Sequence, residues 1–306
     1  MRAVITGATG FAGKWLVKEL LEQNDEVTVV VRDKNNLPDE WNEKVSVVEA
    51  SLSQLSGLCA DSFSAGSADI FFHMAWAGTS GMERADTSLQ LDNVRAACDA
   101  VRLAGRLKCK RFVNAGSIME YEAMQYIPSE NAVPGMGNIY STAKLAADFM
   151  AKTVSKQEKI EYINLIISNI YGAGEKSPRF LNTTLRKMLR NEDVALTTGD
   201  QLYDFIYVTD AAKAIVFAGK NGRPDSTCYI GNPEQFPLKE FVLRMKKVLQ
   251  SNSGLLFGAV PFAGASLSYH EFDTRKLEKM GFAPEVFFEQ GVLLTRDWIL
   301  EENDAY

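Results

Sequence analysis

Residue types that bind metals or form disulfides are scarce in this sequence. There are four cysteines, Cys59, Cys98, Cys109 and Cys228, and only two histidines. The cysteines form no C-x-x-C pair and no histidine cluster lies near them, so we expect neither a zinc site nor a disulfide framework. Because free cysteine packs like a small hydrophobic residue, we interpret the four thiols as free and mostly buried.

Long hydrophobic runs and an excess of positive charge are also absent. No stretch approaches the roughly 18–20 apolar residues that span a bilayer, and the apolar opening 3–5 is too short for a signal-peptide core. We therefore expect a cytoplasmic protein with no membrane partner. The formal net charge is −6, and the 33 lysines and arginines are scattered. Because nucleic-acid binding depends mainly on neutralising phosphates, we expect no nucleic-acid partner.

The composition that remains is that of an ordinary soluble protein. The 306 residues are 46% hydrophobic and 24% charged, which excludes a disordered or collagen-like chain. This length predicts one large domain or two sub-domains that share a core. A chain of this size buries roughly three quarters of its surface and needs no metal or disulfide to hold it.

Short apolar runs alternate with segments of helical periodicity in the first half of the chain. The predicted strands are 1–6, 26–32, 44–50, 68–75, 108–115 and 161–168, and the predicted helices are 14–23, 83–105 and 138–155. The runs are almost continuously hydrophobic, which indicates strands buried on both faces of a parallel sheet. The alternation with right-handed crossovers predicts an α/β fold, a doubly wound parallel sheet of the Rossmann type.

The regular alternation ends after Tyr171. Beyond it we predict a strand at 203–208 and helices at 178–191, 210–218, 238–250 and 274–280, the last with Gly281 as its C-cap. The chain is thus expected to contain a dinucleotide-binding Rossmann domain, 1–172, to which 204–232 returns. A smaller C-terminal α/β substrate-binding lobe would comprise 173–203 and 233–306. A ligand is expected in the crevice at the carboxyl ends of the strands, between the two parts.

Three glycines follow the first strand at the spacing G-x-x-G-x-x-G. Gly7 permits a tight turn, Gly10 lets a pyrophosphate approach the backbone, and Gly13 lets helix and strand pack closely. Amide groups at the start of the helix, together with its dipole, favour a bound anion. Because the loop lies between a predicted strand and an amphipathic helix, it predicts a dinucleotide cofactor.

The end of the second strand bears on which nicotinamide cofactor binds. Asp33 lies about twenty residues beyond the loop, where an acidic residue would hold the ribose 2′-hydroxyl of NAD. Arg32 precedes it, and its guanidinium would clamp the 2′-phosphate of NADP. On this ground we favour NADP(H), with NAD(H) as the alternative.

Tyr140 and Lys144 are four residues apart in a predicted helix and therefore share one face. A free phenol has a pKa of about 10, and a neighbouring ammonium stabilises its phenolate, which makes a tyrosine a workable acid or base near neutral pH. Ser117 follows the fifth strand, where its hydroxyl can donate to a substrate carbonyl or alkoxide. These three residues predict proton and hydride transfer at a carbonyl group.

Taken together, these segments resemble the extended short-chain dehydrogenase/reductase family, in its NAD(P)-dependent nucleotide-sugar epimerase and dehydratase branch. Residues 6–13 are similar to the family's T-G-x-x-G-F-x-G, 72–75 to F-H-L-A, 169–172 to the start of N-V-Y-G-P-G, 204–210 to D-F-I-Y-V-D-D, and 277–298 to L-G-x-x-P…G…W. Ser117 lies four residues before Tyr121, as the catalytic Ser/Thr does in S-x-x-V-Y-G. The resemblance covers most of the chain.

The resemblance implies roles for particular residues. Ser117, Tyr140 and Lys144 would be catalytic. The cofactor would contact Tyr140, Lys144, the glycine loop and the segments that follow the strands. The other predicted cofactor residues are Gly7, Thr9, Gly10, Phe11, Ala12, Gly13, Arg32, Asp33, Ser51, Leu52, Met74, Ala75, Trp76, Asn93 and Ala115. The substrate would contact Ser117, Ile118, Met119, Asn169, Arg179 and Tyr203. The implied reaction is that of a nucleotide-sugar epimerase or 4-ketoreductase, with Tyr140 as acid and base at a ring carbonyl.

Departures from the family pattern narrow the activity. Dehydratases of this branch carry Asp-Glu directly after the catalytic Thr, whereas this chain has Ile118 and Met119, which cannot move protons. Glu120 comes one position too late, so 4,6-dehydratase activity is not expected. Tyr203 and Ile166 stand where many members have arginines.

Two alternative functions stay open. The changes at Tyr203 and Ile166 favour an NADP-dependent reductase of a non-sugar carbonyl. The other alternative is a non-catalytic, cofactor-sensing binding protein, although a sensor need not keep Ser117, Tyr140 and Lys144.

The resemblance also implies a homodimer. In the family, the helix predicted at 83–105 and the helix that carries Tyr140 build a four-helix interface between two subunits, and the apolar residues of 83–105 lie mostly on one stripe. The expected partners are therefore a second copy of the chain and a small-molecule substrate, a nucleotide-diphosphate sugar.

Overall fold

The computed structural model describes residues 1–126, 135–262 and 268–304. The chain forms two compact units, one of residues 1–167 with 212–228 and the other of residues 168–211 with 229–306. Within the described residues, no helix has the length and apolar character that crossing a membrane requires.

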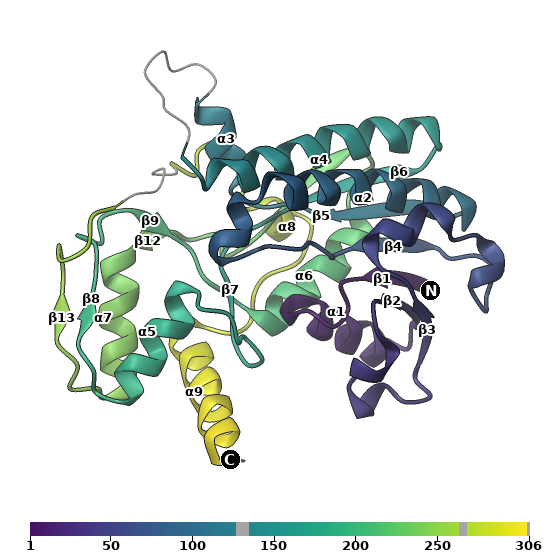
Figure 1. Ribbon diagram of the computed structural model, residues 1–306. Coiled ribbons are helices and arrows are strands. Elements are labelled where there is room, and N and C mark those ends of the chain that lie inside the picture. The colour runs from purple at the N-terminus through teal and green to yellow at the C-terminus, as the bar shows by residue number, and fades with distance from the viewer. Residues whose placement is uncertain (127–134, 263–267, 305–306) are drawn as a thin grey trace. The chain divides into compact units, whose positions relative to one another are not determined.

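The first unit is built on a seven-stranded sheet in the order β11-β6-β5-β4-β1-β2-β3 (Figure 1). Its strands are β1 (Arg2–Thr6), β2 (Glu26–Val31), β3 (Val45–Glu49), β4 (Ile70–His73), β5 (Arg111–Ala115), β6 (Glu161–Ile167) and β11 (Ser226–Ile230). Neighbouring strands from β3 to β6 pair in parallel. This order is that of a doubly wound sheet, and the predicted fold class is confirmed.

Burial on both faces explains why the strands are almost continuously apolar. Phe71 and Phe72 are consecutive residues of β4, both fully buried, and consecutive side chains of a strand point to opposite faces. Phe71 belongs to the core cluster packed against α2 (Thr87–Arg106) and α4 (Asn138–Gln157), which lie side by side (Figure 1). Phe72 packs against α6 (Val208–Asn221), where a Cβ on Gly219 would lie 2.7 Å from the Phe72 ring.

Helix starts in the first unit differ from the prediction because of capping. α1 (Phe11–Glu22) begins directly after the N-cap Gly10, ahead of the predicted start at 14. α2 begins at Thr87 and not at 83, because the Asp86 side chain accepts a hydrogen bond from the Leu89 nitrogen at 3.0 Å and caps the helix. The helix α3 (Glu120–Tyr126) and the strand β11 were not predicted.

The short 3₁₀ helices are η1 (Lys34–Asn36), η2 (Asp39–Trp41), η3 (Leu52–Gly57), η4 (Ala60–Ser62) and η5 (Gly81–Ala85).

The second unit combines helices with short strand pairs. Its helices are α5 (Phe180–Leu189), α7 (Leu238–Leu249), α8 (Lys276–Lys279) and α9 (Phe288–Asp304). Its strand pairs are β7 (Ile170–Tyr171) with β10 (Ile206–Tyr207), β9 (Leu202–Tyr203) with β12 (Phe236–Pro237), and β8 (Val194–Ala195) with β13 (Leu255–Leu256).

Two secondary-structure elements of the second unit are shorter than predicted. The strand predicted at 203–208 is interrupted, because Tyr203 pairs antiparallel with Phe236 while Ile206 pairs in parallel with Ile170. The helix predicted at 274–280 is reduced to α8, which ends before Gly281 at φ +98°. The long helix α9 was not predicted.

Candidate active site

The glycine loop between β1 and α1 has the backbone form of an anion cradle. Gly7 has φ +75°, and a Cβ there would lie 2.5 Å from the Ala75 nitrogen, so only glycine fits. A Cβ on Gly13 would collide with the Gly7 carbonyl oxygen, because α1 starts against the loop. Gly10 is exposed and is an N-cap without a side-chain hydrogen bond. The first amides of α1 are therefore uncapped by a side chain, which fits the pyrophosphate of a dinucleotide.

The other predicted loop residues surround the same turn. Thr9 is exposed, and Phe11 and Ala12 lie half-buried in the first turn of α1. Besides the Thr9 hydroxyl, the polar groups that this loop offers to a ligand are backbone amides, because the side chains of Phe11 and Ala12 are apolar.

The ends of β2 and β3 carry the residues predicted to meet the adenosine part of the cofactor. Asp33 caps η1, accepting from the Asn35 nitrogen at 2.9 Å and from Asn36 Nδ2 at 2.7 Å. Arg32 is exposed, and no described side chain pairs with its guanidinium. Ser51 is the N-cap of η3, in which Leu52 is the first residue. The carboxylate at the end of β2 is thus engaged locally, whereas the guanidinium is not.

Two buried amides of α2 fix the loop after β4, which begins with Met74 and Ala75. Asn93 donates to the Ala77 carbonyl oxygen and accepts from the Ala77 nitrogen, both at 2.9 Å. Gln90 accepts from Trp76 Nε1 at 2.8 Å. These bonds hold the Trp76 indole in place. The direct cofactor contact of Asn93 stays a prediction, since its amide is used on the loop.

A row of polar side chains crosses the buried sheet near the carboxyl ends of its strands. The row consists of the register partners Thr6, His73, Asn114 and Asn164 on β1, β4, β5 and β6, each at most 2% exposed. Thr6 Oγ1 and His73 Nδ1 share a hydrogen bond of 2.8 Å, and Asn114 Nδ2 donates to Asn164 Oδ1 at 2.8 Å. Burial, aided by the charge of Lys144, lowers the pKa of His73 to about 3, so its imidazole is neutral at pH 7.

Tyr140 and Lys144 of α4 meet Trp76 at the end of β5. Lys144 Nζ donates to the Ala115 carbonyl oxygen at 2.7 Å and lies 3.7 Å from the centroid of the Trp76 ring. The Tyr140 ring meets the same indole edge-on, with the centroids 6.1 Å apart. The Arg84 guanidinium, from η5, lies 4.4 Å from the centroid of the Tyr140 ring. The Tyr140 ring therefore has one cationic side chain against it, that of Arg84, and shares the Trp76 indole as a neighbour with Lys144.

Ser117 lies in the turn that connects β5 to α3. Its Oγ accepts from the Met119 nitrogen at 3.2 Å, and its own nitrogen donates to Glu120 Oε1 at 2.7 Å. Ser117 and Ile118 are buried, and Met119 is half-buried. Because the backbone uses the hydroxyl as an acceptor, its hydrogen can donate to a substrate oxygen.

Glu120 joins Ser117 to the polar row. Its Oε2 accepts from Asn164 Nδ2 at 3.1 Å, and the side chain is 2% exposed. Burial raises the pKa of Glu120, and the charge of Asp148 adds to this shift. Burial lowers the pKa of Lys144. The positive charge of Lys144 lowers the pKa of Glu120, and the negative charge of Glu120 raises the pKa of Lys144. Each charge therefore opposes the effect of burial on the other group.

The predicted substrate residues from 169 onward lie in the second unit, whereas Ser117, Tyr140 and Lys144 lie in the first. Asn169 is half-buried between β6 and β7. Arg179 is exposed at the start of α5, with Nε 3.9 Å from Glu175 Oε2. Tyr203 is half-buried and stacks on Phe205 with a centroid distance of 5.8 Å.

Asp204 is a fully buried carboxylate of the second unit. It accepts hydrogen bonds from Ser168 Oγ at 2.6 Å, the Asn232 nitrogen at 2.8 Å and the Tyr269 hydroxyl at 3.0 Å. Burial raises the pKa of Asp204, and these donors act in the opposite direction. The carboxylate thereby connects three separate segments of the chain.

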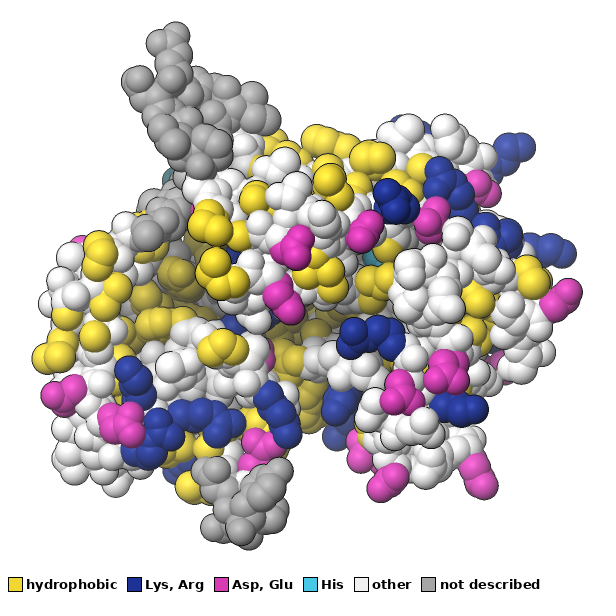
Figure 2. Space-filling view, viewed as in Figure 1, with side chains coloured by type: hydrophobic (Ala, Val, Ile, Leu, Met, Phe, Trp, Pro, Cys, Tyr) yellow, Lys and Arg dark blue, Asp and Glu magenta, His cyan; other side chains and the backbone are white. Residues whose placement is uncertain are grey.

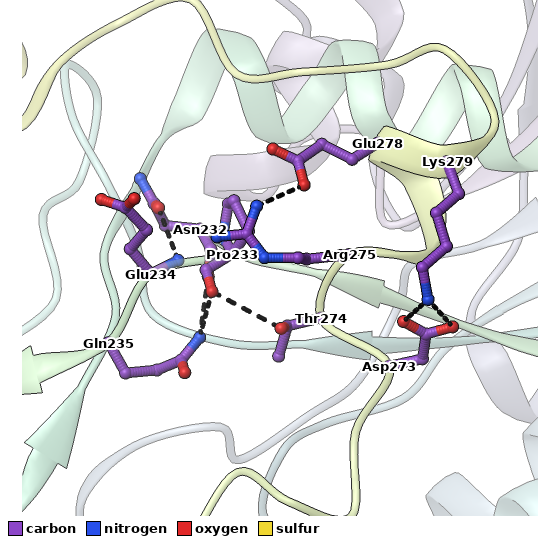
Figure 3. Close-up of polar contacts among 9 residues, drawn as sticks. All are labelled: Asn232, Pro233, Glu234, Gln235, Asp273, Thr274, Arg275, Glu278 and Lys279. Carbon is purple, nitrogen blue, oxygen red and sulfur yellow. Dashed lines mark hydrogen bonds and ion pairs between the residues drawn. The ribbon is translucent and has the colours of Figure 1, made fainter.

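The loop that supplies the Asn232 nitrogen is itself held by polar contacts (Figure 3). Gln235 Nε2 donates to the Pro233 carbonyl oxygen at 2.8 Å, and Thr274 Oγ1 donates to the same oxygen at 3.5 Å. Beyond Thr274, Lys279 pairs with Asp273 at 2.9 Å. The bond from Thr274 links the segment before α8 to the loop after β11, and the other two contacts lie within these segments.

Several residues of the site were missed from the sequence. The signal for Asn114 and Asn164 is present, since each interrupts an otherwise apolar strand, and buried polar groups need partners. From the sequence, Glu120 is recognisable only as an acid one position too late for a dehydratase. Arg84 and Gln90 gave no signal, because their contacts depend on the path of the loop after β4.

The doubly wound sheet and the glycine loop after its first strand define a class, that of Rossmann-type proteins. The family model of the NAD dependent epimerase/dehydratase family matches residues 3–231. The chain belongs to this family, whose members are enzymes of the extended short-chain dehydrogenase/reductase type, and the predicted family is confirmed.

Similar proteins align over nearly the whole chain. CDP-abequose synthase of Salmonella muenchen is 24% identical over 305 residues, covering 95% of each chain. UDP-N-acetyl-alpha-D-glucosaminuronate decarboxylase of Bacillus cytotoxicus is 26% identical over 334 residues, covering 99% of each. Among solved structures, UDP-N-acetylglucosamine 4-epimerase from Methanobrevibacter ruminantium has a TM-score of 0.80 at 20% identity, covering 98% of each chain. WbmF of Bordetella bronchiseptica, in complex with NADH, has a TM-score of 0.79 at 21% identity, covering 99% of this chain and 93% of that one. These structures share the fold.

Proposed function

We propose that this enzyme transfers hydride between a nicotinamide cofactor and a ring carbon of a nucleotide-diphosphate sugar, as a 4-ketoreductase or an epimerase. The observation that carries the proposal is the meeting of Tyr140 and Lys144 with Trp76 at the end of β5. A nicotinamide bound beside these residues supplies or accepts the hydride. Membership of the NAD dependent epimerase/dehydratase family supports the same reaction class.

Each residue of the group has a defined task in this reaction. Tyr140 gives its proton to the carbonyl oxygen as the ketone is reduced, and takes a proton from the hydroxyl in the reverse direction. Ser117 donates a hydrogen bond to the same oxygen and stabilises its developing charge. Lys144 places positive charge near the phenol, which favours loss of the phenol proton. In an epimerase the two directions follow each other on opposite faces of the sugar ring.

Tyr140→Phe tests the proposal. The ring and its contact with Trp76 are kept, so we expect the Kd for NADH or NADPH to stay within about threefold while turnover falls at least ~100-fold. Tyr121→Phe, the same change on α3, is the control and should leave turnover near the wild-type value. Full activity of the Tyr140→Phe variant would refute the mechanism.

The cofactor would be held by the glycine loop, and we propose a preference for NADP(H) over NAD(H). Arg32 supports this choice, since its guanidinium is exposed after β2 and engaged by no described side chain, which suits a 2′-phosphate. The NADH named with WbmF supports NAD(H) as the alternative. Measuring the Kd of both cofactors decides between them: the preference predicts that Arg32→Ala weakens NADPH at least tenfold and leaves NADH unchanged. NAD binding tenfold tighter than NADP in the wild type would overturn it.

We further propose that the first unit serves the cofactor and the second unit the nucleotide-sugar. Asn169, Arg179 and Tyr203 are the substrate residues that the second unit contributes to this proposal. The names of the similar proteins, with CDP in one and UDP in others, support a nucleoside diphosphate. A thermal-shift screen with UDP, dTDP, CDP and GDP identifies the base, and Arg179→Ala should reduce the response.

A reductase of a non-sugar carbonyl is the second candidate. Ile166 is 2% exposed and Tyr203 stacks on Phe205, so both positions at which the family pattern has arginines are apolar or aromatic here. The nucleotide screen separates the candidates, because this one predicts no thermal shift with any of the four diphosphates.

We also propose a homodimer formed through α2 and α4. Leu91 of α2 and Phe149 and Met150 of α4 are large hydrophobic side chains that are 59%, 59% and 52% exposed. Figure 2 shows hydrophobic side chains gathered over these helices. Light scattering at micromolar concentration should give a dimer mass for the wild type and a monomer mass for Phe149→Glu. A monomeric wild type would contradict the proposal.

A further inference from the structure

A buried acid contacts the serine of the proposed site and has no part in the proposed proton transfer. Glu120 is 2% exposed, and its Oε1 accepts from the Ser117 nitrogen at 2.7 Å. The Glu120 nitrogen in turn donates to the Ser117 carbonyl oxygen at 3.0 Å. The backbone of Ser117 is therefore tied to Glu120 on both sides, which fixes the position from which the serine hydroxyl would reach a substrate.

The acid is itself anchored in the sheet. Glu120 Oε2 accepts from Asn164 Nδ2 at 3.1 Å, and Asn164 Oδ1 accepts from Asn114 at 2.8 Å. A Cβ on Gly116 would lie 2.5 Å from Glu120 Oε1 and 2.8 Å from Asn164 Oδ1, so this glycine provides the space for the carboxyl group. Both carboxyl oxygens thus have a donor, and a satisfied buried network of this kind holds its members rigidly.

The charged and titratable groups that face Glu120 come from two neighbouring elements. α4 contributes Lys144 and Asp148, and β6 contributes Tyr162; His73 of β4 lies close enough to Lys144 for its pKa to be lowered by that charge. Lys144 is the cation of this group. Asp148 opposes the ionisation of Glu120, whereas Lys144 favours it, and the effect is mutual.

We propose that Glu120 is a positioning residue of the site, which holds Ser117 at the end of β5 and belongs to the same buried polar network as Lys144. The inference rests on the proposed function for the tasks of Ser117 and Lys144, but the contacts of Glu120 do not depend on the substrate. In this role the acid touches neither substrate nor cofactor, unlike the acid that a dehydratase requires.

Trp76 provides a test that needs no substrate. Because Lys144 Nζ lies 3.7 Å from the centroid of the Trp76 ring, the fluorescence of Trp76 should change with pH as Lys144 titrates. This change should be absent from Lys144→Met and from Trp76→Phe. In Glu120→Gln its midpoint should move to lower pH by about one pH unit, since the ammonium loses its neighbouring carboxylate.

Glu122→Gln is the matched control for the fluorescence titration. Glu122 lies on the same helix and is also buried, and its backbone nitrogen donates to Met119 where that of Glu120 donates to Ser117. Its variant should titrate at the wild-type midpoint. Thermal unfolding verifies that each variant is folded.

Turnover tests the effect on Ser117, with any carbonyl substrate that the wild type reduces. Glu120→Gln should lower kcat about tenfold with KM nearly unchanged, and should move the alkaline limb of the kcat profile to lower pH. Glu120→Asp keeps the acid but is too short to reach the Ser117 nitrogen, so kcat should fall while the fluorescence midpoint stays. This second variant carries the test if Glu120→Gln does not fold.

Two outcomes are decisive. If both Glu120 variants match Glu122→Gln in midpoint and in kcat, Glu120 is a structural acid and the proposal is overturned. If the midpoint moves in Glu120→Gln while Tyr140→Phe keeps full turnover, the link between Glu120 and Lys144 stands and the proposed function fails. The two failures are therefore distinguishable.

Discussion

Each unit of the molecule buries a carboxyl group, Glu120 in the first and Asp204 in the second, and the two have different neighbours. Asp204 accepts hydrogen bonds from three uncharged donors of its own unit. Glu120 accepts hydrogen bonds from two uncharged donors. The charges of Glu120 and Lys144 also shift the pKa of each other.

The difference indicates what each acid does. Uncharged donors stabilise a buried carboxyl group and the segments that carry them, without placing a cation beside its charge. A cation beside the carboxyl group makes the two charges depend on each other, so a change at one alters the protonation of the other. The two acids are thus alike in burial, but their neighbours indicate a structural role for Asp204 and a role in the proposed site for Glu120.

The largest expected effect tests the cation that distinguishes the two acids. Lys144→Met should lower kcat about 1,000-fold, or about 4 kcal/mol in activation free energy, because the positive charge near Tyr140 is lost. Lys152→Met is the control, since Lys152 lies on the same helix and donates to the Asp225 carbonyl oxygen at 3.2 Å, away from Tyr140 and Ser117. If Lys144→Met kept turnover within fivefold of the wild-type value, the cation that distinguishes Glu120 from Asp204 would have no role in catalysis.

Asp204→Ala should act on stability. The substitution leaves a buried hydroxyl of Ser168, a backbone nitrogen of Asn232 and the phenol of Tyr269 without their acceptor, and we expect the free energy of unfolding in urea to fall by about 3 kcal/mol. The pH dependence of kcat should keep its shape. A displaced pH profile would show that Asp204, too, is linked to the reaction.

His73 extends the comparison to a buried base on the polar row. Its pKa is lowered from 6.5 to about 3 in the folded protein, so the unfolded chain binds a proton there that the folded chain does not. Stability is therefore lost as the pH falls from 6.5 toward 3, by about 2 kcal/mol at pH 5 from this residue. Urea unfolding at pH 7 and pH 5 should show this loss in the wild type and a loss smaller by that amount in His73→Asn. Equal losses would contradict it.

The smallest effects come from a glycine beside each acid. A Cβ on Gly116 would lie 2.5 Å from Glu120 Oε1, and a Cβ on Gly231 would contact Asp204 Oδ2 and lie 2.5 Å from Ser168 Oγ. We expect Gly116→Ala and Gly231→Ala each to cost about 1.5 kcal/mol of stability. Only Gly116→Ala should also lower kcat, by a few-fold. Equal turnover in the two variants would weaken the distinction between the acids.

Local signals explain why much of the first unit was predictable. The strands β1, β2 and β5 are apolar runs bounded by turns, and the glycine loop directly follows β1 in the sequence. The second unit offered fewer such signals. Tyr203 pairs with Phe236, and Ile206 with Ile170, so the break between β9 and β10 depends on partners from distant segments.

The residues of the candidate site also divide into those that local sequence signals predict and those that they do not. Tyr140 and Lys144 are recognisable because they lie one helical turn apart, and Ser117 because it follows a buried strand. The position of Glu120 depends on Asn164, 44 residues further along the chain, and that of Arg84 on a loop. Such contacts arise only when the sheet aligns β5 with β6, and spacing along the sequence does not encode them.

The polar row has a consequence for folding. Uniformly apolar strands distinguish poorly between adjacent alignments, since a shifted strand still buries hydrophobic side chains. A slip of β4 by one residue would remove His73 from Thr6 and turn its imidazole to the opposite face of the sheet. Each polar group buried without a partner costs about 1–3 kcal/mol, so misaligned sheets are disfavoured. The polar row therefore favours the correct alignment of the strands at the edge where the proposed chemistry occurs.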